Sequence, residues 1–135
     1  MKLVVDANIM FAALVKAGIT ADLMFHSSLE LHAPEFILFE FSKYKELLMA
    51  KTGRPEEEFM RLLEVFGRRM DLESQEQLEP LLGEAMRICP DPKDVPYIAL
   101  ALKLGCAIWS NDKALASVAG IKVYSTQELA KLLLK

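Results

Sequence analysis

Four acidic residues occupy positions from which their side chains could meet at one edge of a folded domain. Asp6 and Asp112 each follow a run of residues typical of a buried strand, and Asp94 opens a run typical of an apolar helix. Glu40 lies well inside another predicted helix, on its apolar side. The chemistry that this sequence offers is therefore that of carboxylates.

Glu40 has the least ordinary position of the four. It stands three residues after Ile37 and four before Tyr44, so it shares the apolar stripe of that helix. It is too deep in the helix to cap it, and burying an unpaired carboxylate is unfavourable unless a partner or a metal ion compensates. The alternative is structural: an ion pair with a buried Lys or Arg, or a place at the rim that reaches water.

Each aspartate also has an ordinary explanation. Asp is a preferred N-cap residue, and Asp6, Asp94 and Asp112 all stand close to a predicted helix start. Asp91 lies between two prolines and is predicted to be a turn residue. Each of the three aspartates at helix starts could therefore be an N-cap residue or a catalytic residue.

If the four acids converge, their like charges repel and raise one another's pKa values. A divalent cation relieves this repulsion. Oxygen ligands without a nearby His or Cys favour Mg²⁺ or Mn²⁺ over zinc. Such an ion suits phosphoryl chemistry, because it activates water and neutralises charge on the attacked phosphate.

Strands and helices alternate along the chain without repeats, low-complexity tracts or a linker. Strands are predicted at residues 2–5, 30–33, 106–110 and 121–124. Helices are predicted at residues 9–16, 21–29, 35–51, 76–88, 95–104 and 113–119, with one that begins at Pro55 and a last one that begins at Ser125 or Thr126 and runs through Leu134. No strand is predicted between Pro55 and residue 76.

Strands that alternate with helices pair in parallel, which predicts an α/β fold: a three-layer α/β/α sandwich around a central, mostly parallel sheet. The chain has 135 residues, of which 53% are hydrophobic, so we expect one domain over residues 1–135. Ligands of such sheets bind outside the carboxyl ends of the strands, where Asp6 and Asp112 are placed.

Composition narrows the function classes. There are 19 acidic and 16 basic residues, a balance that argues against a protein that simply coats nucleic acid. Cys89 and Cys106 have no Cys or His at zinc-ligand spacing and suggest no disulfide framework, so reduced thiols in a cytoplasmic protein are expected. The N-terminus reaches a charge after three apolar residues, and no apolar run approaches the roughly 20 residues of a membrane span. Neither a signal peptide nor a membrane segment is expected.

Four short motifs, in order along the chain, resemble those of the PIN domain family. They are VVDAN at residues 4–8, Pro34 followed six residues later by Glu40, DPKDVPYIALA at residues 91–101, and SND at residues 110–112. Together they cover essentially the whole chain. The ordered set of four carries the resemblance, because each motif alone is short.

The resemblance implies a doubly wound α/β domain and a Mg²⁺- or Mn²⁺-dependent endoribonuclease that acts on single-stranded RNA. It also implies the metal-binding catalytic acids, which are Asp6, Glu40, Asp94 and Asp112. Asn8 and Ser110 are expected to support these carboxylates. Many small stand-alone members are toxins of the VapC type, each neutralised by a short antitoxin protein, so a toxin role and an antitoxin partner are implied too.

RNA binding would fall to local basic groups, since the overall charge is negative. The candidates are Lys43, Lys45, Arg54, Lys93 and Lys113. Lys93 and Lys113 are favoured because each neighbours one of the acids. The other three are interpreted as parts of solvated helix surface.

The mechanism implied is hydrolysis of an RNA phosphodiester by a metal-activated water that attacks in line, which leaves a 5′-phosphate and a 3′-hydroxyl. One alternative is a non-catalytic module of the same fold that binds RNA or a protein. Another is a signalling receiver domain, which is disfavoured because Asp6 has no acidic neighbour and no mid-chain strand is predicted.

A homodimer is also expected. Phe59, Leu63 and Phe66, beside Met60, are predicted to leave apolar surface on the helices between residues 35 and 70. Pairing of two copies through these helices would bury that surface.

Overall fold

A parallel β-sheet forms the centre of the structure. The computed structural model describes residues 1–89 and 91–134, and Pro90 and Lys135 lie outside the described residues. Within those ranges, five strands form one sheet in the order β3-β2-β1-β4-β5, and every neighbouring pair is parallel. The predicted α/β class with a parallel sheet is confirmed.

Strands and helices follow one another along the chain, with two consecutive helices after each of β1, β2 and β3. The strands are β1 (Lys2–Val5), β2 (Glu30–Pro34), β3 (Met70–Glu73), β4 (Ala107–Trp109) and β5 (Val123–Tyr124). The helices are α1 (Ala7–Val15), α2 (Ile19–Met24), α3 (Phe36–Thr52), α4 (Glu56–Arg68), α5 (Gln75–Ile88), α6 (Val95–Leu104), α7 (Lys113–Ala116) and α8 (Thr126–Leu133).

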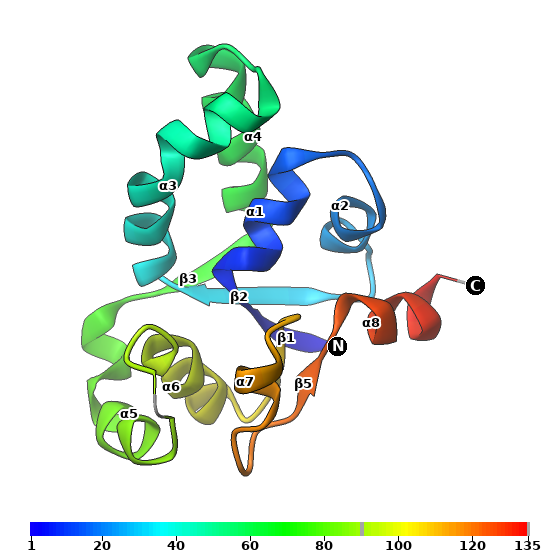
Figure 1. The fold of residues 1–135 in the computed structure, drawn as a ribbon. Helices are drawn as coiled ribbons and strands as arrows, with labels where there is room; N and C mark the ends of the chain where they lie inside the picture. The colour runs from blue at the N-terminus through cyan, green and yellow to red at the C-terminus, as the bar shows by residue number, and fades with distance from the viewer. Residues whose placement is uncertain (90, 135) are drawn as a thin grey trace.

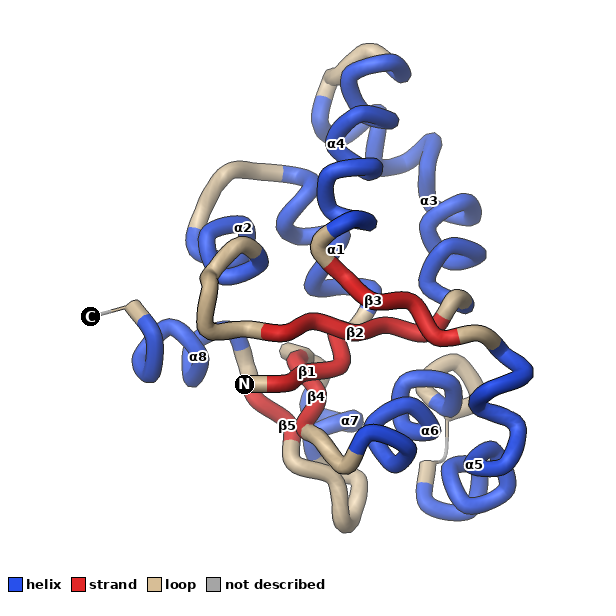
Figure 2. The backbone as a smooth tube through the Cα atoms, turned by 180° about the vertical axis from the view of Figure 1, so that it is seen from behind, coloured by secondary structure: helices blue, strands red, loops and turns tan. Residues whose placement is uncertain are grey.

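Helices cover both faces of the sheet (Figure 1). The helices α1 to α4 lie on one face, and α5, α6 and α7 lie on the other, which the view from behind also shows (Figure 2). The last helix, α8, packs against α2. The arrangement is the predicted three-layer sandwich.

The strand order reverses at β1. The chain runs outward from β1 to β2 and β3, and then returns to place β4 on the other side of β1. Such a reversal opens a crevice at the carboxyl ends of the two strands that flank it. Asp6 follows β1 and Ser110 follows β4, and the backbone N–H of Asp6 donates to the carbonyl oxygen of Trp109 at 3.1 Å. The fold therefore brings these two predicted site residues side by side.

The sequence explains the elements next to this crevice. Leu3, Val4 and Val5 are fully buried in β1, as expected for a strand covered on both faces. The helix α3 ends at Gly53, whose φ of 64° lies in the left-handed region that glycine adopts readily. In α6 the residues from Tyr97 to Ala101 are buried without a break, because this helix lies between the sheet and α5.

The strand β3 was not predicted. In this four-residue strand Met70 is buried and Asp71 is exposed. The two acids of so short a segment disfavour a strand, because acidic residues have low strand propensity. It forms because it pairs with β2 at the sheet edge, where charged side chains reach water. A mid-chain strand therefore exists, but it lies two strands from β1, so Asp71 is not positioned as the phosphoacceptor of a receiver domain.

The apolar surface predicted for a dimer is only partly present. Phe59 and Phe66 are buried within the chain, so they belong to the core. Met60 and Val65 on α4, and Leu38 on α3, are exposed. Among the described residues, no helix is both long enough and apolar enough to cross a membrane.

Candidate active site

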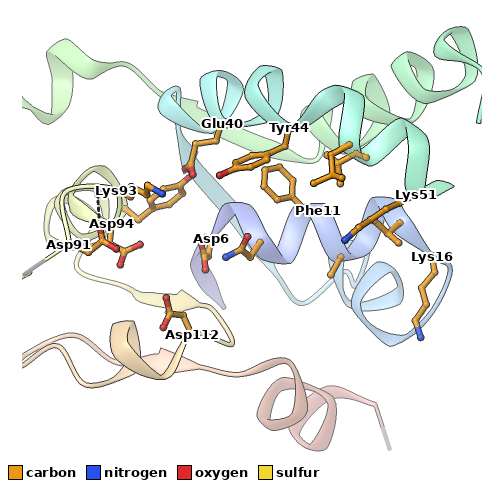
Figure 3. Close-up of a pocket in the computed structure, with 16 residues that line it drawn as sticks. Asp6, Phe11, Lys16, Glu40, Tyr44, Lys51, Asp91, Lys93, Asp94 and Asp112 are labelled. Carbon is orange, nitrogen blue, oxygen red and sulfur yellow. Dashed lines mark hydrogen bonds between the residues drawn. The ribbon is translucent and has the colours of Figure 1, made fainter. Parts of the chain in front are cut away.

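A cavity of about 620 Å³ opens at the carboxyl edge of the sheet (Figure 3). All four predicted acids line it, as do Asn8 and Lys93; the acids are Asp6, Glu40, Asp94 and Asp112. They come from the end of β1, from α3, from the start of α6 and from the loop after β4. Segments more than 100 residues apart in sequence, such as those that carry Asp6 and Asp112, meet there.

Asp6 lies at the bottom of the site and is 7% exposed. Its Oδ2 accepts a 2.7 Å hydrogen bond from the hydroxyl of buried Ser110. Burial raises the pKa of Asp6, the Ser110 hydroxyl and the nearby backbone N–H of Asn8 oppose that rise, and the charge of Asp112 adds to it. Although Asp6 precedes α1, its side chain makes no cap hydrogen bond, and its carboxylate is bonded to Ser110 instead.

Glu40 faces the cavity from α3. Its Oε1 accepts a 2.6 Å hydrogen bond from the hydroxyl of Tyr97, which is 1% exposed. Burial raises the pKa of Glu40, the Tyr97 hydroxyl lowers it, and the charge of Asp6 raises it again. No ion pair of Glu40 with a Lys or Arg is present among the described residues; instead the carboxylate is half-buried at the cavity, where it can reach water, and is hydrogen-bonded to a tyrosine hydroxyl.

Asp94 stands at the start of α6, where its side chain makes no cap hydrogen bond. Burial, together with the charges of Asp6, Asp91 and Asp112, raises its pKa to about 6. Asp91 lies beside it at the cavity wall, with Oδ1 accepting from the backbone N–H of Lys93 at 3.0 Å (Figure 3). Asp91 is thus the turn residue that was predicted, and it adds negative charge to the site.

Asp112 serves as the N-cap of α7, because its Oδ1 accepts from the backbone N–H of Ala114 at 2.9 Å. It also lines the cavity, so capping and facing the site are compatible for this residue. Its own backbone N–H donates to the Ser110 hydroxyl at 3.0 Å. Ser110 thereby links Asp6 to Asp112.

The loop that carries Ser110 and Asp112 is tied to the start of α8. The side chain of Asn111 donates to the hydroxyl oxygen of Thr126 at 3.1 Å and accepts from its backbone N–H at 2.8 Å. The indole N–H of Trp109 donates to the same hydroxyl at 3.0 Å. These bonds fix the loop against a buried part of the chain, which holds the two site residues in place.

The basic candidates divide into two groups. Lys45 pairs with Glu56, and Arg54 donates to the carbonyl oxygen of Leu14, so both have structural partners. Lys93 lines the cavity, and its charge lowers the pKa of Glu40. Lys113 begins α7, outside the cavity wall that the described residues form.

The acids supply oxygen donors of the kind that Mg²⁺ and Mn²⁺ prefer. Within the described part of the chain, no three or more Asp, Glu, His or Cys side chains are grouped closely enough to hold one metal ion. The pKa values of Asp6, Glu40 and Asp94 are nonetheless raised, by burial and also by repulsion from neighbouring acids. A divalent cation would relieve that repulsion, so the donor chemistry fits such an ion once side chains rotate toward it.

Sequence reasoning missed several residues of this cavity. Phe11 and Tyr44 line it, as do Lys16 and Lys51 at the end away from the acids. Tyr97 belonged to a recognised motif, but its hydrogen bond to Glu40 was not foreseen. The only available signal was physical: a carboxylate on an apolar stripe needs a hydrogen-bond donor nearby.

The fold and the cavity together define the class, an α/β protein with an acidic cavity where the strand order reverses. In a comparison with known protein families, residues 4–134 match the PIN domain. The chain belongs to the PIN domain family, whose members are typically nucleases. Comparison with curated proteins gives no match.

Proposed function

We propose that this protein is a metal-dependent endoribonuclease that hydrolyses single-stranded RNA. The observation that carries the proposal is the convergence of four acids, from four separate elements, on one cavity of a PIN domain. Paired and hydrogen-bonded carboxylates at a strand-order reversal are suited to a divalent cation and a phosphate group.

The acids have separate roles in this proposal. Asp6, Glu40 and Asp94 would hold Mg²⁺ or Mn²⁺, directly or through water. Asp112 would help to bind the ion or to orient the attacking water. When bound, the ion would supply activation of that water and neutralisation of charge on the phosphate.

The remaining residues act through position and charge. The Ser110 hydroxyl holds Asp6 in one orientation, and the Tyr97 hydroxyl does the same for Glu40. Asn8 supports Asp6 from the cavity wall. Lys93 brings a positive charge to the acidic end of the cavity, where it would meet a phosphate oxygen. Lys113 neighbours Asp112 in sequence and would contact the RNA outside the cavity.

Hydrolysis by water breaks the bond between phosphorus and the 3′ oxygen. The products then carry a 5′-phosphate and a 3′-hydroxyl. Cleavage of an end-labelled single-stranded RNA tests the proposal, with Mg²⁺, with Mn²⁺ and with excess chelator. Asp6→Asn should abolish cleavage while Asp71→Asn, at an exposed carboxylate on β3, should not. Recovery of 2′,3′-cyclic phosphate ends, or full activity of Asp6→Asn, would refute the proposed mechanism.

The second candidate is a non-catalytic module of the same fold that binds RNA or a protein. It is favoured by one observation, that no three or more acids, histidines or cysteines within the described residues are grouped tightly enough to hold a metal ion as they stand. This candidate predicts RNA binding without cleavage at any divalent-cation concentration. The same assay therefore separates the two candidates.

A physiological role as the toxin of a toxin–antitoxin pair is a further part of the proposal. Controlled expression should then arrest growth, and the ends of cleaved cellular RNA should map to defined sites. A short antitoxin protein would relieve the arrest. We also propose a reducing, cytoplasmic location, with which the two free thiols of Cys89 and Cys106 are compatible.

We also propose a homodimer. Its contact surface would include the exposed apolar side chains of Leu38 on α3 and Met60 on α4, both of which lie near Leu63 and Glu64. Arg68 and Glu64 lie beside them and form an ion pair along α4. A self-complementary pairing of two such surfaces would remove them from water.

A further inference from the structure

The cavity continues well beyond the acids, between α1 and α3. On α1 the wall is formed by Asn8, Phe11, Ala12 and Val15, which recur at helical spacing. On α3 it is formed by Glu40, Tyr44, Leu47, Leu48 and Lys51, also at helical spacing. One face of each helix thus lines a single channel that changes from acidic to apolar and then to basic along its length.

Two aromatic rings mark the start of the apolar part. The rings of Phe11 and Tyr44 meet edge to face, with centroids 5.6 Å apart. Both are half-buried, and Figure 3 shows the Tyr44 ring beside Glu40 with its hydroxyl oxygen turned toward the acidic end. Lys43 lies over the Tyr44 ring at 5.4 Å from its centroid. Phe11 thus orients the ring, and a base that stacks on the face under Lys43 would displace that exposed side chain.

The walls that follow are aliphatic. Leu47 is 54% exposed even though it is apolar, and Ala12 and Val15 lie across from it on α1. Apart from the Tyr44 hydroxyl, the described residues of this stretch bring no hydrogen-bonding side chain to the cavity. The apolar face of one flat ring system could pack here, and no polar side chain of this stretch would select among rings by hydrogen bonds.

Lys51 closes the channel at its far end. It stands in the last turn of α3, and Figure 3 shows its ammonium group turned into the cavity, whereas Lys16 points away from it. Among the residues that the structure describes, Lys51 makes no ion pair. Glu40 and Lys51 are eleven residues apart in α3, a rise of about 16 Å at roughly 1.5 Å per residue. That span covers several nucleotide steps, each of which is about 3.4 Å in a stacked strand.

We propose that the channel from Tyr44 to Lys51 is a nucleotide subsite, in which a base adjoining the scissile phosphate stacks against Tyr44 and a phosphate further along the strand meets Lys51. The inference rests on the proposed function for the nature of the ligand. Aromatic faces and a basic group along one groove are the elements by which proteins bind single strands with little sequence preference. The subsite should therefore bind a nucleotide that carries a base more tightly than an abasic one, and should discriminate poorly among the bases.

Direct binding tests the subsite apart from catalysis. The Asp6→Asn chain, in buffer without divalent cations, is titrated into a fluorescein-labelled adenosine hexanucleotide and into an equally long abasic ribose-phosphate chain with the same label. The expected anisotropy result is tighter binding of the adenosine oligomer by roughly tenfold, the scale of one base–aromatic contact. Tyr44→Ala should remove this preference and Tyr44→Phe should keep it. Lys51→Ala should weaken binding of both oligomers and reduce the slope of log Kd against log salt by about 0.7.

A matched pair of variants distinguishes a specific loss of binding from a loss of folding. Leu47→Glu places a negative charge in the channel at an exposed position, and should abolish the preference for bases. Leu132 on α8 is 52% exposed and lies outside the cavity, so Leu132→Glu should leave binding unchanged. Far-ultraviolet circular dichroism checks the fold of each variant.

Two outcomes overturn the subsite: equal binding of the two oligomers, or identical behaviour of Leu47→Glu and Leu132→Glu. These outcomes are distinct from failure of the proposed function. A chain that shows the base preference but cleaves no RNA keeps the subsite and refutes the nuclease. A chain that cleaves RNA but binds both oligomers equally refutes the subsite alone.

Discussion

The hydroxyl of Tyr97 on α6 donates a 2.6 Å hydrogen bond to Oε1 of Glu40 on α3. These two helices cover opposite faces of the sheet, so the bond crosses its carboxyl edge (Figure 1). Burial, and then the bond to Glu40, raises the pKa of the Tyr97 hydroxyl, so it stays protonated and remains a donor. The orientation of Glu40 thus depends on a residue 57 positions later in the chain.

Tyr97→Phe removes this donor while keeping the buried ring. The pKa of Glu40 should rise further, because the hydroxyl lowers it now. We expect affinity for Mn²⁺, measured by calorimetry, to fall by roughly tenfold, as for other partners of metal-binding carboxylates. Tyr124→Phe, on β5, is the control. Unchanged Mn²⁺ affinity in Tyr97→Phe would show that Tyr97 does not position Glu40 for an ion.

Ser110→Ala removes the donor to Asp6. Asp6 is buried, so its carboxylate would lose a hydrogen bond that water cannot easily replace. The free energy of unfolding should fall by about 1–3 kcal/mol in urea denaturation. Ser42→Ala, at an exposed position on α3, should change stability little. Equal effects of the two substitutions would mean that the Ser110 bond contributes nothing specific.

Asp94 should contribute measurably to the change of folding stability with pH. Its pKa rises from 3.8 to about 6 on folding, so between these values the folded chain binds a proton that the unfolded chain releases. This contribution makes the metal-free protein less stable as pH rises from about 4 to 6. Carboxyl groups with lowered pKa values, such as Glu56 beside Lys45, act in the opposite direction.

Comparison of the parent protein with Asp94→Asn isolates this contribution of Asp94. The variant should be more stable than the parent at pH 7.5, and the difference should shrink toward pH 4. Thermal unfolding in chelator across this range is the measurement. A difference that does not change with pH would contradict the raised pKa.

Metal binding should stabilise the fold. An ion that binds only the folded chain adds about 2.7 kcal/mol at a concentration 100 times its Kd. We therefore expect the melting temperature to rise with added Mg²⁺ or Mn²⁺. Asp94→Asn should reduce the rise, whereas Asp71→Asn should retain it. Equal rises in the two variants would place the ion outside the acidic cavity.

The proposed dimer is tested by sedimentation equilibrium. The mass should shift from one chain to two as concentration rises. Met60→Glu on α4 should favour the single chain, because it introduces a charge into the proposed contact. Met86 is also exposed but lies on α5, so Met86→Glu should leave association unchanged. A mass of one chain at all concentrations would refute the proposed dimer.

Local sequence determined most of the secondary structure. Two kinds of helix can be recognised from local sequence: α4, whose apolar residues recur at helical spacing, and α6, a continuous apolar stretch that ends at Gly105. Short elements were less well defined: the predicted strand at 121–124 is Val123–Tyr124, and the predicted helix at 113–119 is Lys113–Ala116. The strand β3 was missed because its pairing with β2, a long-range contact, outweighs the weak strand preference of its acids.

For the site, the sequence by itself determined which carboxylates to examine, since each stands at the end of an element or on an apolar stripe. Only the tertiary structure decided their partners. The bond from Ser110 to Asp6 spans 104 residues, and the channel between α1 and α3 exists only where the two helices pack together. Local preferences act over a few residues, whereas hydrogen-bond partners and cavity walls are set by how distant segments meet.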